Sequence, residues 1–582
     1  MSARARPDPK NRPVLLLGGG SGEATCGILY LAGYLRRNGV EAFVRLYDGD
    51  QTQAEMTRSL SNLVSHLKPA IVGVSVKWFS HVSRALLIAK TLRKLDPALR
   101  IVFGGDSASF YWRELAGSDC VDEIILGDGE QPLLALCRGE RAVPNLVTRK
   151  SDGSPERLPL QYVQNAQSDD VFYSHFDDIF CSQLDQSSFS GWVAPGKGCG
   201  ENCVYCAGGR GLQQATFGRP DSFLRPPQAV HLDHREIAHR TWQLRYDFSG
   251  GTAEFLGGAW QGVDLTQHAT TYFLWGVPPR SLIDALAQTF GRVYLVLDIG
   301  CFSSLQRTEL MRRGLLKPCP TDRELLTTVE ACRAHPNLKL EVCGIGGLPF
   351  TSEKARAQEG ALVDTLLGLD CDVGSQRLES QPGALVTAHP GRFEMISDAT
   401  SFTEFVDWFA KRGHQTAGAF PMIRYADAGV EAAVQRAADE LQEKLERHAA
   451  KKHVVVTART RFVTTIASTR RVALGDWLGR HHVPKKLANE TISVMRSIDG
   501  AGLALAPTLS ERKFTDPNLQ QGESATAIAT ALSLFERPST VDAALSRLEK
   551  EARLDAESAH ELIDQLAVGK FIAPVGPRAP KP

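Results

Sequence analysis

The sequence predicts an α/β protein with a doubly wound N-terminal domain, then a partial (β/α) barrel and a small C-terminal α/β region. Short apolar segments alternate with helical patterns through residues 14–105, which is typical of a doubly wound parallel sheet. A second alternation runs through residues 191–378 and favours a full or partial parallel barrel. Both architectures bind ligands beyond the carboxyl ends of their strands. We therefore expect the functional residues at those ends.

The composition excludes several classes of protein. Hydrophobic residues make up 43% and charged residues 23% of the 582 residues, as in ordinary globular proteins. The net charge is zero, so no overall field attracts nucleic acid or an acidic membrane. No apolar run approaches the ~20 residues that span a bilayer, and the N-terminus does not resemble a secretory signal. The twelve cysteines are scattered, unlike those of a disulfide scaffold. We expect a cytoplasmic monomer without membrane or nucleic-acid partners.

The N-terminal domain is predicted over residues 1–141. Its first strand ends in the glycine-rich turn 18–22, and later strands end at residues 75–78 and 104–107. Such a turn can bind a dinucleotide, but this one lacks the G-x-G-x-x-G spacing. No acidic residue stands where the ribose of NAD or FAD would need one, so a dinucleotide is the less favoured ligand.

A linker is predicted over residues 142–190, where polarity is mixed and no periodicity persists. The barrel domain follows over residues 191–410. Its six strand candidates are residues 191–194, 252–256, 271–275, 293–298, 338–343 and 373–378. Helical patterns lie between several of them, at residues 279–289, 322–334 and 352–367.

Three cysteines open the barrel domain with the spacing C-x3-C-x2-C: Cys199, Cys203 and Cys206. Three thiolates can hold three irons of a [4Fe–4S] cluster. The fourth iron is then open to a small molecule. The alternatives are three buried thiols or a zinc loop, but zinc requires a fourth nearby Cys or His. The next candidate cysteine is Cys301.

The octapeptide 199–206, with Tyr205 before the third cysteine, resembles the radical S-adenosylmethionine (SAM) enzymes. In that family SAM binds the open iron, and the reduced cluster cleaves it to methionine and a 5′-deoxyadenosyl radical. Later strand ends are similar to further family motifs, although Asp298 replaces Glu, Phe302 replaces Gln and Phe350 replaces Gly. The resemblance implies that these residues contact SAM: Tyr205, Gly257, Gly258, Asp298, Ser303, Gly346 and Leu348.

The N-terminal domain is similar to the cobalamin-binding domain that precedes many radical SAM modules. The implied cobalamin contacts are Gly19, Gly20, Ser75, Val76, Lys77, Trp78, Gly104, Gly105, Gly127 and Glu130. The D-x-H-x-x-G motif of domains that place a histidine on cobalt is absent after the first strand. We therefore expect cobalamin to bind base-off, without a histidine from that loop.

Together these resemblances imply a cobalamin-dependent radical SAM methyltransferase. Such an enzyme moves a methyl group from SAM, via methylcobalamin, to an unactivated carbon of a natural-product, amino-acid or peptide substrate. An external reductant such as flavodoxin or ferredoxin is expected. The alternatives are a non-methylating cobalamin radical SAM enzyme that rearranges or cyclises its substrate, and a cobalamin-binding sensor with an electron-transfer cluster.

An accessory region is predicted over residues 411–520 and a winged-helix-like module over residues 521–582. Residues 430–453 have the pattern of a long charged amphipathic helix, and residues 454–467 are rich in Val and Thr, as strands are. The module resembles winged helices that hold leader peptides. Its acidic residues offset its basic ones, so it lacks the charge expected of a DNA-binding module.

Overall fold

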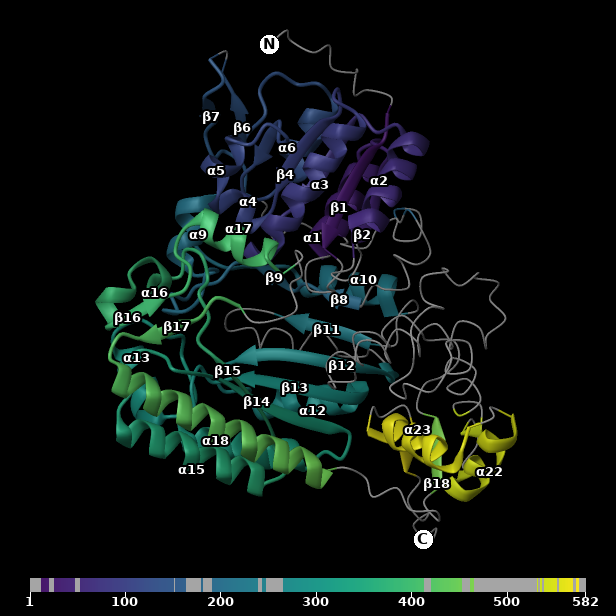
Figure 1. Cartoon of the computed structure of the whole chain (residues 1–582), viewed down its shortest axis with the longest axis vertical. Coiled ribbons are helices and arrows are strands. Elements are labelled where there is room, and N and C mark those ends of the chain that lie inside the picture. Colours follow the sequence, from purple (N-terminus) through teal and green to yellow (C-terminus); the bar gives the residue numbers. More distant parts are fainter. Residues whose placement is uncertain are drawn as a thin grey trace. The chain divides into compact units, whose positions relative to one another are not determined.

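A computed structural model describes most of the first 452 residues and a smaller part of the rest (Figure 1). The described residues are 12–19, 26–47, 53–150, 152–163, 179, 181, 191–238, 243–247, 265–412, 420–452, 461–464, 531, 534–535, 539–551, 554–568 and 572–574. They fall into two compact units, the first within residues 1–186, 192–238 and 243–443, and the second within 187–191, 239–242 and 444–582. No helix in the described part is both long and apolar enough to cross a membrane.

The first sheet has seven strands in the order β2-β1-β3-β4-β5-β6-β7. Its parallel strands are β1 (Val14–Gly19), β2 (Ala42–Tyr47), β3 (Ile71–Ser75), β4 (Arg100–Gly104) and β5 (Glu123–Ile125). This order reverses between β1 and β3, and ligands of such sheets bind at the carboxyl side of that point. The structure confirms the predicted doubly wound domain.

Helices cover this sheet because its strands are apolar on both faces. They are α1 (Cys26–Arg37), α2 (Gln53–Leu67), η3 (Phe79–His81), α3 (Val82–Leu95), α4 (Asp106–Phe110), α5 (Trp112–Ala116) and α6 (Glu130–Cys137). Leu15, Val72 and Phe103 are among the completely buried residues of its core.

The segment predicted as a linker contains two strands. β6 (Leu146–Arg149) and β7 (Pro155–Arg157) add an antiparallel hairpin to the edge of the first sheet. Buried Asn145 anchors it, because its amide nitrogen donates to Leu126 O at 3.1 Å and to Tyr162 O at 2.6 Å. The prediction was wrong here because the strands are short and β7 is exposed, so no hydrophobic alternation marks them.

The second sheet has six strands in the order β15-β14-β13-β12-β11-β8. They are β8 (Gly191–Val193), β11 (Gln243–Asp247), β12 (Leu265–Trp275), β13 (Phe290–Asp298), β14 (Leu338–Gly346) and β15 (Asp372–Arg377). β11 to β15 pair in parallel. This agrees with the expected partial barrel. The sequence missed β11, which is polar, and the strand predicted at residues 252–256 lies outside the described residues.

Helices follow the barrel strands, as the alternation predicted. They are α9 (Arg210–Phe217), α10 (Pro227–Ala238), α12 (Arg280–Thr289), α13 (Ser304–Arg312), α14 (Asp322–Arg333), α15 (Glu353–Gly368) and α16 (Leu385–Ala388). Short strands β9 (Gly196–Lys197) and β10 (Phe223–Leu224) pair beside them, as do β16 (Met395–Ser397) and β17 (Ile423–Tyr425), and η4 (Pro390–Phe393) precedes β16.

One helix that the sequence assigns to the barrel packs on the N-terminal domain instead. α17 (Phe402–Ala410) contacts α3 and η3. The ring of Phe79 lies 5.3 Å from that of Phe405 and 6.0 Å from that of Phe409, both edge to face. Such aromatic pairs add to the free energy of burial, so the chain after β15 returns to stabilise the first sheet.

Three strands and two helices are described in the second unit. β18 (Arg461–Thr464) pairs antiparallel with β19 (Ser539–Thr540) and β20 (Ile572–Pro574), and α22 (Val541–Glu551) packs on α23 (Ala556–Val568). α22, α23, β19 and β20 lie within the predicted winged-helix-like module, whereas β18 lies in the region predicted as accessory; the winged-helix assignment stays a prediction. The long helix predicted at residues 430–453 is confirmed as α18 (Ala428–Lys452).

Replacing Phe405 with alanine tests the packing of α17. The side chain is 1% exposed, so Phe405→Ala should lower the free energy of unfolding by about 3–5 kcal/mol. Urea unfolding measures this loss. The control is Ile396→Ala in β16, because that side chain is 49% exposed and its loss should cost within about 0.5 kcal/mol. Equal effects of the two substitutions would contradict the packing.

Candidate active site

The cysteine loop lies between β9 and α9. Cys203 is buried, whereas Cys199 and Cys206 are half-buried. Each sulfur accepts a backbone N–H: Cys203 from Lys317 at 3.3 Å, Cys206 from Gly208 at 3.2 Å and Cys199 from Glu201 at 3.5 Å. Hydrogen bonds of this kind favour the thiolate over the thiol. The loop therefore presents three sulfurs prepared to act as ligands.

Burial works against ionisation of the same thiols. It raises the pKa of Cys203 to about 12, although the Lys317 ammonium and N–H lower it. Burial likewise raises the pKa of Cys206, and the N–H of Gly208 opposes the change. Metal ions bind the thiolate, so binding a cluster here would release protons.

A zinc ion and an iron–sulfur cluster place different demands on the three cysteines. Among the described residues, no three or more His, Cys, Asp or Glu side chains are grouped as ligands of a metal ion. Zinc lies about 2.3 Å from each thiolate and so draws its ligands close together. Cysteines that each bind a different iron of a cluster stand further apart. The C-x3-C-x2-C spacing, with no fourth cysteine nearby in sequence, favours a cluster over zinc.

Backbone hydrogen bonds tie this loop to the carboxyl ends of two barrel strands. Val204 N donates to Leu315 O at 2.8 Å, in the segment after β13, and Val386 N donates to Val204 O at 3.0 Å, after β15. Ala207 N donates to Gln381 Oε1 at 3.3 Å. Gly198 enters the loop with φ +88°, and a Cβ there would lie 2.8 Å from Asp221 O. Only glycine fits this entry without strain.

A buried ion pair lies beside the cysteine loop. Asp298, at the end of β13, accepts from Lys317 Nζ at 2.5 Å and from Gly300 N at 2.7 Å. Lys317 is 5% exposed, and its ammonium lies 4.8 Å from the centre of the Trp275 ring. Burial lowers the pKa of Lys317, but the Asp298 carboxylate raises it more. Lys317 therefore brings a fixed positive charge to the loop.

The sequence reasoning missed Lys317 and Trp275. Lys317 stands between Leu316 and Pro318, and Trp275 ends an apolar strand. The one available signal was the position of both residues after strands of the predicted barrel. The contact between Lys317 and Cys203 spans 114 residues of sequence, so no local pattern reports it.

Other residues expected to contact SAM have structural partners. Ser303 is completely buried and caps α13, accepting from Gln306 N at 3.3 Å and donating to Gln358 Oε1 at 3.2 Å. Leu348 is also completely buried, and its carbonyl accepts from Gln306 Nε2 at 2.6 Å. Tyr205 is buried in the same apolar cluster as Cys203. SAM contacts by these residues remain predictions.

Three further residues of the expected SAM site are Gly346 and the two aromatic residues, Phe302 and Phe350, that replace the usual motif residues. Gly346 ends β14, and a Cβ there would approach nothing closer than 3.8 Å, so space adjoins it. Phe302 is completely buried against Gly344, and Phe350 packs edge to face with Phe393 at 6.2 Å. Both aromatic departures are therefore packing residues. Gly257 and Gly258 lie outside the described residues.

The loops after β3 and β4 touch at the carboxyl edge of the first sheet. Val76 N donates to Gly104 O at 2.7 Å, and Ser107 Oγ donates to Lys77 O at 2.9 Å. Gly105 has φ +101°, and a Cβ there would lie 3.0 Å from Val76 O. Any side chain at Gly105 would therefore push these loops apart.

The remaining residues expected to bind cobalamin occupy different environments. Ser75 pairs with Gly104 across β3 and β4, and Gly19 ends β1 beside Tyr47. Trp78 is 40% exposed, and Lys77 is half-buried. Gly127 N donates to Ser109 Oγ at 2.9 Å. Glu130 is buried and accepts from Lys197 at 3.0 Å. Gly20 lies outside the described residues.

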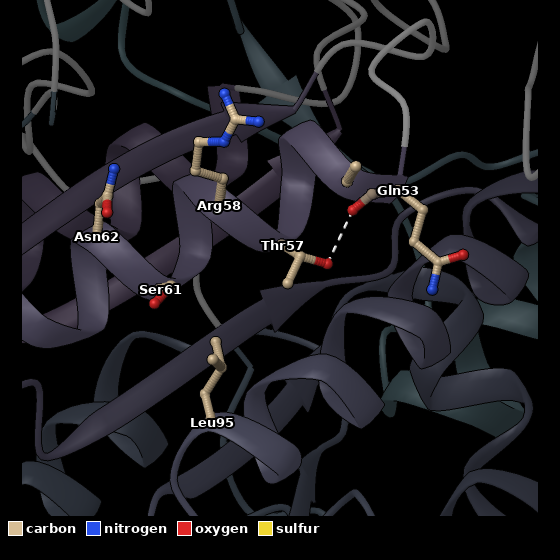
Figure 2. A pocket seen from close by; sticks show the side chains of 7 residues that line it. Gln53, Thr57, Arg58, Ser61, Asn62 and Leu95 are labelled. Atoms are coloured by element: carbon tan, nitrogen blue, oxygen red, sulfur yellow. Dashed lines mark hydrogen bonds between the residues drawn. The ribbon is translucent and has the colours of Figure 1, made fainter.

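A surface hollow lies away from these loops. Figure 2 shows it along α2, where Gln53, Thr57, Arg58, Ser61 and Asn62 face it with Leu95 from the end of α3. Its volume is about 730 Å³. Thr57 Oγ donates to Gln53 O at 2.8 Å within the helix. None of the candidate site residues lines it.

Comparisons with known proteins agree with this architecture. Residues 18–137 match the B12 binding domain family. No curated protein sequence matches the chain. Among solved structures, the chain is similar to the radical S-adenosylmethionine methyltransferase TsrM from Kitasatospora setae with cobalamin and [4Fe–4S] cluster bound. The TM-score is 0.56 at 16% identity, over 76% of this chain and 92% of that one.

A second TsrM structure, with tryptophan substrate and the SAM analogue aza-SAM, gives a TM-score of 0.56 at 15% identity, covering 86% of this chain and 97% of that one. The cobalamin-dependent S-adenosylmethionine radical enzyme OxsB gives 0.49 at 11% identity, covering 90% and 84%. The chain therefore contains a B12 binding domain and shares the fold of TsrM.

Iron content tests the cysteine loop. Anaerobic reconstitution of the wild-type chain should give about four irons per chain. Cys199→Ala, Cys203→Ala and Cys206→Ala should each lose the cluster absorbance, because each removes one ligand. Cys343→Ala is the control, since Cys343 lies within β14. Loss of iron in the control but not in the three variants would show that the site is misplaced.

Cobalamin retention tests the contact between the β3 and β4 loops. Gly105→Ala should reduce the cobalamin bound per chain, because its Cβ meets Val76 and its φ is strained. Gly153→Ala carries similar strain at φ +84°, but nothing lies within 4 Å of its Cβ. The corrinoid spectrum of the purified proteins measures retention. Equal retention in both variants would refute this role of Gly105.

Proposed function

We propose that this protein is a cobalamin-dependent radical SAM methyltransferase that moves a methyl group from SAM to a carbon of a small-molecule or peptide substrate. One observation carries the proposal: the loop of Cys199, Cys203 and Cys206 lies in the same compact unit as the B12 binding domain. The shared fold of TsrM supports it.

The cofactors would supply the reactive chemistry, the cluster by binding and reducing SAM and cobalamin by carrying the methyl group. Cys199, Cys203 and Cys206 would hold the cluster. The loops after β3 and β4 would hold cobalamin, and Gly105 would keep them close together because its missing side chain makes room for Val76.

The protein's own contribution is electrostatic and geometric. Lys317 donates its N–H to Cys203 Sγ and holds its ammonium beside the thiol. That positive charge would stabilise the negative charge of the thiolate ligand. Asp298 fixes the ammonium at 2.5 Å, and buried Lys317 with half-buried Trp275 would keep water from this side of the loop.

The B12 binding domain would supply the surface that binds cobalamin. It lacks the D-x-H-x-x-G motif after β1, so base-off cobalamin without a histidine ligand from that loop belongs to the proposal. The substrate would be a natural product, an amino acid or a peptide, and an external flavodoxin or ferredoxin would supply electrons. The winged-helix-like region would bind protein or peptide rather than nucleic acid.

Product analysis tests the reaction, and tryptophan is the first substrate to try because it occupies a TsrM structure. If the enzyme makes a substrate radical, methylated product should form with equal amounts of S-adenosylhomocysteine and 5′-deoxyadenosine. If no substrate radical is made, methylated product should form with S-adenosylhomocysteine but without 5′-deoxyadenosine. The Cys203→Ala protein is the control and should form neither product. Formation of 5′-deoxyadenosine without methyl gain by any substrate tried would favour rearrangement or cyclisation over methyl transfer.

A further inference from the structure

Four charged side chains, three of them buried and Lys197 half-buried, form a cluster that we call the carboxylate clamp: Asp128, Glu130, Lys197 and Arg219. Arg219 Nη2 donates to both oxygens of Asp128, at 2.8 and 2.9 Å. Lys197 Nζ donates to Asp128 at 3.1 Å and to Glu130 at 3.0 Å. Asp128 is 9% and Glu130 4% exposed. Buried charges require partners with good geometry, so each member depends on the others.

The clamp joins the two domains at a particular place. Asp128 and Glu130 follow β5 of the first sheet, whereas Lys197 ends β9 and Arg219 follows α9. Lys197 precedes Cys199 by two residues, and Arg219 follows Cys206 by thirteen. The segment 197–219, which contains all three cysteines, is therefore held at both ends by carboxylates of the B12 binding domain.

A short chain of hydrogen bonds leads from the clamp to the β4 loop. Gly127, next to Asp128, donates its N–H to Ser109 Oγ at 2.9 Å. Ser109 Oγ in turn donates to Gly105 O at 2.9 Å. Gly105 contacts the β3 loop at Val76. These contacts connect the cysteine loop to the loops expected to bind cobalamin, so the position of one constrains the other.

Asp128 is the centre of the clamp because both cations converge on it. Nη2 of Arg219 donates to both of its oxygens, while Nη1 donates to Gln213 Oε1 at 3.2 Å, so the guanidinium is held in place from two sides. Without the Asp128 charge, Lys197 would retain Glu130, but Arg219 would lose its paired carboxylate. The C-terminal end of the segment 197–219 would then be released.

We propose that Asp128 is a positioning residue that holds the cysteine loop in register with the B12 binding domain for transfer between the two bound cofactors. This inference rests on the proposed function, but its physical content is the fixed placement of residues 197–219. The contacts of the clamp set that placement.

The test compares Asp128→Asn, which keeps the size of the side chain and removes its charge, with Asp119→Asn in the same domain. Asp119 is a matched control because its side chain is fully exposed. In the cofactor-free protein, Asp128→Asn should speed hydrogen exchange of residues 197–219, and Asp119→Asn should not. In the reconstituted protein, iron and cobalamin contents should match those of the wild type.

Two further measurements separate positioning from stability. The electron-spin distance distribution between cobalt(II) and the reduced cluster should broaden in Asp128→Asn. Transfer of a labelled methyl group from SAM to the corrinoid should slow by about tenfold to a hundredfold, since a 1 Å misplacement can cost on the order of 10²-fold. Arg219→Lys keeps the charge but loses the second donor nitrogen that bonds Gln213, so it should shift all three measurements in the same direction and by less.

Wild-type exchange and spin distance in Asp128→Asn would overturn the positioning role. If Asp128→Asn does not yield folded protein, the same two measurements are made on Arg219→Lys, and wild-type values there would overturn the positioning role. If the wild-type chain loads neither iron nor cobalamin, the proposed function fails, and hydrogen exchange alone still decides whether the clamp holds residues 197–219.

Discussion

The arrangement of the first unit depends on the charged cluster that joins the segment after β5 to β9 and to the residue after α9. Removing Asp128, Lys197 and Arg219 from water is costly, and close ion pairs offset that cost only in one geometry. Packing adds a second constraint, because Phe405 of α17 inserts beside Phe79 of η3. The ion pairs act near the cysteine loop, and the aromatic packing acts near α17. Both sheets belong to one compact unit.

Within that unit, the candidate cluster ligands lie near the carboxyl ends of the barrel strands. Backbone donors after β13 and β15 hold the cysteine loop, and the Asp298–Lys317 pair places a cation against Cys203. This loop has little regular structure of its own, so its shape comes from the segments around it. The positive φ of Gly198 turns the chain into the loop, and hydrogen bonds to distant segments hold the loop in shape. That dependence explains why substitutions far from the sulfurs could alter the site.

The sequence predicted those features that are encoded locally. The alternation of strands and helices reports burial on a sheet, and C-x3-C-x2-C reports ligand geometry within eight residues. Lys317 could not be found this way, because its partner Cys203 is 114 residues distant. Glu130 was expected to contact cobalamin, yet the structure also pairs it with Lys197. The hairpin in the expected linker escaped prediction because both strands are short, β7 is exposed and neither has hydrophobic alternation.

Transfer of a labelled methyl group from SAM to the protein-bound corrinoid tests the central claim most directly, because it requires both domains and no knowledge of the substrate. The protein is reconstituted anaerobically with iron, sulfide and cobalamin, then incubated with SAM carrying a deuterated methyl group. Acid extraction and mass spectrometry follow. We expect the extracted corrinoid to carry the deuterated methyl group, with S-adenosylhomocysteine formed in equal amount. A chain that retains cobalamin yet leaves it unlabelled would contradict the account.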